Sequence, residues 1–202
     1  ADVLCQTARR FLVIVEREFG KRFAYEQLTN FDIGASCRLR ADEREHLYRV
    51  VHEPDELMRM APIVEAIATV KLWADAGYEI AIVTGRPPTS FEVSRAWLEQ
   101  HGVAHHSMIM VDKYGRFGAS NTAAITLQEL AARQYCWAVE DSLPMAEFLA
   151  SQMSLPVALV DRPWNRASQD PANVHRHTDW PTIARSMPMT AGENFVARSS
   201  EK

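Results

Sequence analysis

Short apolar runs alternate with helical patterns between residues 63 and 160, which predicts strands that are each followed by a helix. The runs that predict strands are residues 78–83, 107–111, 135–139 and 156–160. The segments with apolar residues at helical spacing are residues 63–76, 90–101, 122–133 and 144–152. The connections are short, as parallel strands with helices on both faces require. We therefore expect an α/β fold with a doubly wound parallel sheet.

The first sixty residues show a different pattern. Residues 7–19 and 41–51 predict helices, residues 23–33 are rich in aromatic and turn-forming residues, and no strand pattern is evident. We expect the end of a first strand at Val3–Leu4, followed by a small helical cap over residues 7–61. The core then consists of residues 1–6 and 62–186, and residues 187–202 are expected to form a flexible tail.

Composition narrows the class of protein. The 202 residues are 47% hydrophobic, with a net charge of −4, so the chain lacks the basic field that binds a nucleic-acid polymer. Its apolar runs fall short of the roughly 20 residues of a membrane span. Three widely separated cysteines, Cys5, Cys37 and Cys136, predict neither a disulfide framework nor a zinc site. We expect a cytoplasmic protein.

Polar side chains come directly after three of the predicted strands. They are Thr84-Gly85-Arg86 after the first of these strands, Asp112-Lys113 beside the second, and Glu140-Asp141-Ser142 after the third. Because parallel strands end at the same edge of a sheet, and ligands bind there, we expect these groups to converge.

This set of groups suits phosphoryl transfer. A phosphate needs a hydroxyl donor such as Thr84, a cation such as Lys113, and a divalent metal held by carboxylates. Glu140 and Asp141 place two like charges side by side, which Mg²⁺ would neutralise. One would bind the metal and the other a metal-bound water. Taken singly, Thr84 and the Glu-Asp-Ser segment suit helix caps and Lys113 suits a solvated loop, so the prediction depends on the combination.

The same segments resemble conserved motifs of the haloacid dehalogenase superfamily. Residues 82–87 (Ile-Val-Thr-Gly-Arg-Pro) resemble its second motif, Asp112-Lys113 its third, and residues 139–142 (Val-Glu-Asp-Ser) its fourth. Within the superfamily, residues 160–166 (Val-Asp-Arg-Pro-Trp-Asn-Arg) and 178–180 (Thr-Asp-Trp) resemble the 5′(3′)-deoxyribonucleotidase group. The resemblance covers roughly residues 1–186. It implies a Rossmannoid core and Mg²⁺-dependent hydrolysis of phosphomonoesters, such as (deoxy)nucleoside monophosphates, through an aspartyl-phosphate.

The resemblance also implies roles for individual residues. Thr84, Gly85, Arg86 and Lys113 would bind the phosphorylated substrate. Thr84, Lys113 and Asp2 would be catalytic, and the metal ligands would come from Glu140, Asp141 and Asp2.

The first motif of the superfamily, Asp-x-Asp-Gly-(Thr or Val)-Leu, leaves two alignments open. Asp2 is either the second aspartate, the general acid/base, with the glycine missing, or it replaces the glycine and Ala1 takes the acid/base position. In both alignments we expect the nucleophilic aspartate upstream of residue 1.

Two alternatives to a phosphatase stay open. A chain with an altered first motif could keep the fold as a binding or interaction module. A carbon–halogen hydrolase uses an aspartate without magnesium, and the Glu140-Asp141 pair argues against it. The expected partner is a small phosphorylated substrate, and a homodimer is left open. Aromatic residues of the cap (Phe23, Tyr25, Phe31 and Tyr48) suit either stacking on a base or the core of the cap itself.

Overall fold

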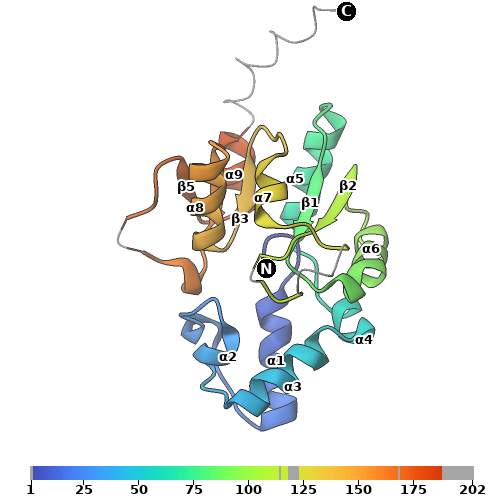
Figure 1. Cartoon of the computed structure of the whole chain (residues 1–202), viewed down its shortest axis with the longest axis vertical. Helices are drawn as coiled ribbons and strands as arrows, with labels where there is room; N and C mark the ends of the chain where they lie inside the picture. The colour runs from blue at the N-terminus through green and yellow to red at the C-terminus, as the bar shows by residue number, and fades with distance from the viewer. Residues whose placement is uncertain (1, 114, 118–122, 168, 188–202) are drawn as a thin grey trace, which may run out of the picture.

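The computed structural model describes residues 2–113, 115–117, 123–167 and 169–187, and within them the fold is α/β with parallel strands (Figure 1). The strands form two small sheets. In the first sheet, β1 (Ala81–Thr84) pairs with β2 (Ser107–Met110). In the second, β4 (Val157–Val160) lies between β3 (Ala138–Glu140) and β5 (Val174–His177). The predicted fold class is confirmed and is compatible with a haloacid-dehalogenase-like Rossmannoid core.

Helices follow the strands closely where the pattern predicts them. They are α5 (Val64–Asp75), α6 (Phe91–Gln100) with the short 3₁₀ helix η2 (Pro88–Ser90) before it, α7 (Leu127–Ala131), α8 (Leu143–Gln152) and α9 (Trp180–Ser186). The prediction for residues 122–133 was too long, because Thr126 caps the helix. Its hydroxyl accepts the Glu129 N–H at 3.1 Å, and the Glu129 carboxylate accepts the Thr126 N–H at 2.7 Å. The alternative cap, Thr122, lies outside the described residues.

Two expectations about strands were wrong. Val3 and Leu4 lie in a turn, and the nearest pairing is an isolated bridge between Cys5 and Pro62. Conversely, β5 occupies a stretch expected to be a loop between the last strand and the last helix. Its sequence, Val-His-Arg-His, carries a single apolar residue, and among the described strands it pairs only with β4. An edge strand with so little apolar surface gives a weak sequence signal.

The second sheet is covered on both faces. All four residues of β4 are fully buried, as expected for a central parallel strand. Ala158 and Val160 join one apolar cluster, which includes Ile183 of α9, whereas Val157 and Leu159 join another, which includes Leu149 of α8. This alternation follows from the two-residue repeat of a strand. β3 pairs with β4 in parallel, so both strands run in the same direction in the sheet.

Residues 7–61 are helical, with no strand. Their elements are α1 (Thr7–Phe19), the 3₁₀ helix η1 (Tyr25–Gln27), α2 (Ile33–Ser36), α3 (Ala41–Val51) and α4 (Pro54–Met58). The helices predicted at 7–19 and 41–51 are confirmed. Figure 1 shows α1, α2 and α3 below the sheets, at one end of the molecule. The division of the chain into a core and a cap stays a prediction, and the expected tail (187–202) lies outside the described residues except for Met187. None of the described helices has the length and apolar composition needed to cross a membrane.

A buried glutamate ties α4 to α1. Glu56 is 4% exposed and accepts hydrogen bonds from Arg10 Nε at 2.7 Å and Arg17 Nη1 at 2.8 Å. Burial raises the pKa of Glu56, but the hydrogen bonds from Arg17 and Arg10 outweigh it, so the pKa lies below its ordinary value. The contribution of this carboxylate to stability is therefore complete above the pKa that Glu56 has in the unfolded chain. It is lost as the pH falls through the lowered pKa of the folded protein.

Replacing Glu56 with glutamine is expected to reduce the free energy of unfolding at pH 7 by about 3 kcal/mol, because two guanidinium groups lose their buried partner. The difference from the wild type should shrink below about pH 4, where the wild-type carboxylate also becomes neutral. Urea unfolding of the variant and the wild type, at pH 7 and below about pH 4, measures the difference in the free energy of unfolding. Glu92→Gln, which removes an exposed partner of Arg95, is the matched control and should cost less than about 1 kcal/mol. Equal losses for the two variants would contradict the prediction.

Candidate functional site

The predicted site residues line one cavity of about 1700 Å³. They are Asp2, Thr84, Gly85, Arg86, Lys113, Glu140 and Asp141. They come from the turn at the start of the chain, the end of β1, the loop after β2 and the end of β3. Direct contacts bring side chains from both sheets together, since Lys113 lies against Gly85 and its Nζ lies 3.5 Å from Glu140 Oε2. The Asp2 N–H donates to Asp141 Oδ2, so the start of the chain joins the same group.

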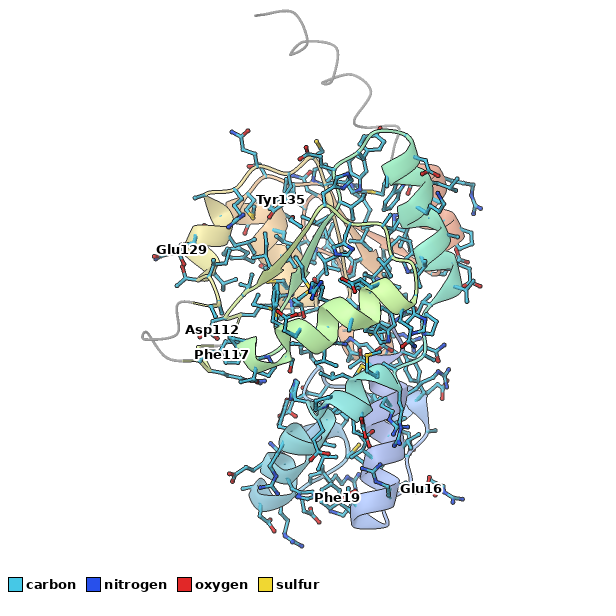
Figure 2. The ribbon with its side chains drawn as sticks, turned by 90° about the vertical axis from the view of Figure 1, so that its right-hand side faces the viewer. Glu16, Phe19, Asp112, Phe117, Glu129 and Tyr135 are labelled. Carbon is cyan, nitrogen blue, oxygen red and sulfur yellow. The ribbon has the colours of Figure 1, made fainter. Side chains whose placement is uncertain are left out.

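The loop after β2 is fixed by its own aspartate. The Asp112 carboxylate accepts the Arg116 N–H at 2.8 Å and the Phe117 N–H at 3.1 Å, and Figure 2 shows Asp112 and Phe117 together on this loop. The next residue, Lys113, extends its side chain over Gly85. A Cβ atom at Gly85 would lie 3.2 Å from Lys113 Cδ, so glycine leaves room for the lysine side chain.

The Lys113 ammonium ends beside Glu140. Lys113 Nζ lies 3.5 Å from Glu140 Oε2, and each side chain is only 9% exposed. Glu140 Oε1 accepts the Ser142 N–H at 3.2 Å. Burial raises the pKa of Glu140, and the Lys113 ammonium opposes this rise. The pair is therefore a buried ion pair in which each partner offsets the desolvation of the other.

Asp141 differs from Glu140 in having a carboxylate oxygen without a hydrogen-bond partner among the described residues. The residue is fully buried, and its Oδ2 accepts the Asp2 N–H at 2.9 Å. Its Oδ1 is buried, and no described residue donates a hydrogen bond to it. A buried carboxylate oxygen without a donor is costly unless a cation or water completes its environment.

The carboxylates of Asp141 and Glu140 are compatible with a Mg²⁺ site. The described residues contain no group of three or more histidine, cysteine or acidic side chains around one metal position. Mg²⁺ commonly takes one or two carboxylates and completes its shell with water and phosphate oxygens, which requires no such group. Asp141, with Oδ1 uncommitted, is the better placed of the two predicted ligands, since Lys113 already faces Glu140.

The Asp2 carboxylate is buried and engaged by the protein on both oxygens. Oδ1 accepts the Ala8 N–H at 2.8 Å, and Oδ2 accepts the Tyr25 hydroxyl at 3.1 Å. Burial raises the pKa of Asp2 above its ordinary value. Asp2 therefore lies in the cavity as predicted. Its bonding suits a residue that exchanges a proton better than one that binds a metal directly.

Thr84 and Arg86 also line the cavity and make hydrogen bonds within the protein. The Thr84 hydroxyl accepts the Arg86 N–H at 3.3 Å. The Arg86 guanidinium donates to Ser94 Oγ at 2.9 Å and contacts the sulfur atoms of Met60 and Cys5 at 3.2 and 3.6 Å. Arg86 thus ties the loop after β1 to α6, and the Thr84 hydroxyl proton remains available for a second acceptor.

Sequence reasoning missed the contacts that aromatic residues make around the site. Tyr25 on η1 packs edge-on against Trp164, which lies on the 3₁₀ helix η3 (Pro163–Asn165), with ring centroids 5.6 Å apart. Tyr25 donates to Asp2, and Trp164 Nε1 donates to the Asp141 carbonyl at 3.1 Å. The sequence alone leaves open whether Tyr25 stacks on a base or belongs to the core of the cap. Tyr25 and Trp164 are 139 positions apart in the chain, and no local sequence pattern indicates that they pack together.

Comparisons with known proteins bear on the fold and on the class of protein. Residues 49–138 match the family described as "PITM 1-3, LNS2 domain", a domain with a haloacid-dehalogenase-like phosphatase fold. The chain is also 24% identical over 171 residues to "Putative nucleotidase BH1399" of Halalkalibacterium halodurans. That alignment covers 84% of this chain and 80% of the relative. Together with the fold, these similarities support a haloacid-dehalogenase-like phosphohydrolase. Membership of the deoxyribonucleotidase group stays a prediction.

Proposed function

We propose that the protein is a Mg²⁺-dependent phosphomonoester hydrolase that works through an aspartyl-phosphate and acts on (deoxy)nucleoside monophosphates. The observation that carries the proposal is the cavity in which the uncommitted Asp141 oxygen and the Lys113–Glu140 ion pair lie, where Lys113 follows β2 and Asp141 follows β3. This arrangement offers both a cation site and a fixed positive charge to one phosphate group.

Each side chain has a separate task in this proposal. Thr84 and Lys113 hold the oxygens of the transferring phosphoryl group, and Gly85 allows the lysine to approach. Asp141 would hold Mg²⁺ directly, and Glu140 would orient a water molecule bound to the Mg²⁺. When bound, Mg²⁺ would neutralise charge on the phosphate oxygens. In the absence of substrate, Glu140 and Lys113 neutralise each other.

The reaction proceeds in two displacements. A carboxylate, which the family places two residues before its acid/base aspartate and hence ahead of Ala1, attacks phosphorus. A P–O bond to the carboxylate forms as the ester P–O bond breaks, and protonated Asp2 gives its proton to the leaving oxygen. Water then attacks phosphorus, Asp2 takes its proton, and the bond to the carboxylate breaks to release phosphate. The burial that raises the pKa of Asp2 favours the protonated form that the first step needs.

Two observations support a nucleotide as the substrate. One is the name of the bacterial relative, and the other is the resemblance of residues 160–166 to the deoxyribonucleotidase group. The cavity extends to aromatic residues of the helical region, including Phe31 and Tyr48, which could pack against a planar base. The proposal includes no nucleic-acid polymer and no membrane. It places the protein in the cytoplasm and leaves a homodimer open.

A panel of phosphomonoesters and haloacids tests the reaction class. The protein as its gene encodes it should release phosphate in the presence of Mg²⁺, with nucleoside monophosphates among the best substrates. Phosphate release restricted to esters without a base would contradict the nucleotide part of the proposal. Halide release that is insensitive to EDTA would indicate the dehalogenase alternative. No turnover of any compound would overturn the hydrolase proposal and favour a binding module.

A further inference from the structure

The loop between β4 and β5 lies beside Asp141 although the reaction proposed above does not use it. This loop carries the Arg-Pro-Trp-Asn segment (162–165), whose last three residues form η3. Its last residue, Asn165, is 1% exposed. An asparagine is seldom buried so completely, and a buried amide must find hydrogen-bond partners for its donors and acceptor.

All the hydrogen-bonding positions of the Asn165 side-chain amide are used. Nδ2 donates to the Asp141 carbonyl at 2.8 Å and to the Val160 carbonyl at 2.7 Å. Oδ1 accepts the Arg162 N–H at 3.1 Å and Arg176 Nη1 at 2.7 Å. Exchanging the amide nitrogen and oxygen would place donor against donor and acceptor against acceptor. The network therefore fixes one orientation of the amide.

Arg176 on β5 holds the other side of this loop. Its Nη2 donates to the Asn165 carbonyl at 2.9 Å, and its guanidinium pairs with Asp161 at 2.9 Å and with Asp170 at 2.6 Å. The two carboxylates balance the charge of the guanidinium. Arg176 can therefore donate hydrogen bonds to Asn165 without leaving an unpaired charge. Asn165 thus joins β4, β5 and Asp141, the residue that follows β3.

The Asp141 carbonyl receives two donors from this loop. Besides Asn165 Nδ2, Trp164 Nε1 donates to it at 3.1 Å. Its carboxylate, by contrast, accepts one bond from the main chain of Asp2 and leaves Oδ1 uncommitted. The direction of a side chain depends on the main chain from which it extends. Holding the carbonyl therefore restricts where Oδ1 can lie.

We infer that Asn165 and Trp164 are positioning residues that hold the Asp141 main chain and thereby set the place of its metal-facing oxygen. The inference rests on the proposed function only in taking Asp141 as a metal ligand. Residues that orient a ligand without touching the metal commonly change metal affinity by 10- to 100-fold when they are replaced. We therefore expect a loss of metal affinity of about tenfold or more for Asn165→Ala, and a smaller loss for Trp164→Phe.

Mn²⁺ is the probe for this test. Its dissociation constant for the wild-type protein, Asn165→Ala and Trp164→Phe is measured from the electron paramagnetic resonance signal of free Mn²⁺. The melting temperature of each metal-free protein is measured in parallel. Trp97→Phe is the matched control, because Trp97 Nε1 donates to the Met60 carbonyl at 2.8 Å and makes no hydrogen bond to Asp141. A purely structural role predicts that Trp164→Phe and Trp97→Phe lower the melting temperature and leave Mn²⁺ affinity unchanged.

The outcomes separate this inference from the proposed function. Weaker Mn²⁺ binding by the loop variants, with binding by Trp97→Phe unchanged, supports it. If the wild type binds Mn²⁺ and every variant binds it with the same affinity, the inference is overturned and the proposed function stands. Failure of the wild type to bind Mn²⁺ overturns the metal site itself and the inference with it. If Asn165→Ala does not fold, Trp164→Phe decides, because it keeps an aromatic ring to pack on Tyr25 and removes the Nε1–H donor, and Trp97→Phe makes the same reduction in side-chain size.

Discussion

Replacing Asp141 with asparagine is expected to reduce kcat/KM for a phosphomonoester by about 1000-fold, because a bound divalent cation supplies several kcal/mol of charge stabilisation. Asparagine keeps the shape of the side chain, and its amide oxygen can still accept the Asp2 N–H. The amide then has no negative charge to offer the metal at the position of Oδ1. Since the change also removes a buried charge, we expect the metal-free variant to be as stable as the wild type or more stable.

Steady-state phosphate release at saturating Mg²⁺, together with urea unfolding in EDTA, measures both effects. Asp75→Asn is the charge-matched control, since Asp75 is an exposed partner of Lys71 on α5 and does not line the cavity. Its kcat/KM should equal that of the wild type. An Asp141→Asn enzyme that keeps wild-type turnover would show that the uncommitted oxygen is not the metal ligand.

Replacing Lys113 with methionine is expected to lower both activity and stability. Removing a preorganised charged donor from a phosphoryl-transfer site typically costs about 100-fold or more in kcat. The same change leaves the Glu140 carboxylate buried without its cation, which we expect to reduce the free energy of unfolding by about 3 kcal/mol. Phosphate release and urea unfolding in EDTA are the measurements.

The double variant Lys113→Met/Glu140→Gln distinguishes the two effects. Removing both charges should restore at least half of the lost stability, because no unpaired buried charge remains. It should restore no activity, since the cation that faces the phosphate is still missing. Lys71→Met, which breaks an exposed pair, is the control and should change stability by less than about 1 kcal/mol. Additive stability losses in the double variant would contradict a direct ion pair.

The positions of the site residues were predictable because they depend on local patterns and on one rule of topology. Apolar runs locate β1, β2 and β3 approximately, and parallel strands place the residues at their ends along one edge. Thr84, Lys113 and Asp141 therefore fall in one cavity, as their positions in the sequence suggest. The same local reasoning identifies α1, α3, α5, α6 and α8, whose amphipathic patterns are long enough to be distinct.

Strand β5 and the hydrogen bonds between distant residues depend on contacts that a local sequence pattern does not indicate. The strand β5 has one apolar residue in four and is stabilised by its partner β4, so its sequence resembles a loop. The bond from Tyr25 to Asp2 joins residues 23 positions apart, and the bond from Asn165 to Asp141 crosses between two strand ends. A buried asparagine looks like any other loop asparagine in a sequence. Only the folded chain shows that its amide is fully bonded.

The most direct test of the account is a Mg²⁺ titration of phosphate release from a nucleoside monophosphate by the protein as its gene encodes it. We predict a rate that rises to saturation with Mg²⁺, returns to background in EDTA, and recovers when excess Mg²⁺ is restored. The same titration of Asp141→Asn should stay close to background at every Mg²⁺ concentration. Phosphate release that is equally fast in EDTA, or that is unaffected by the Asp141 change, would contradict the account.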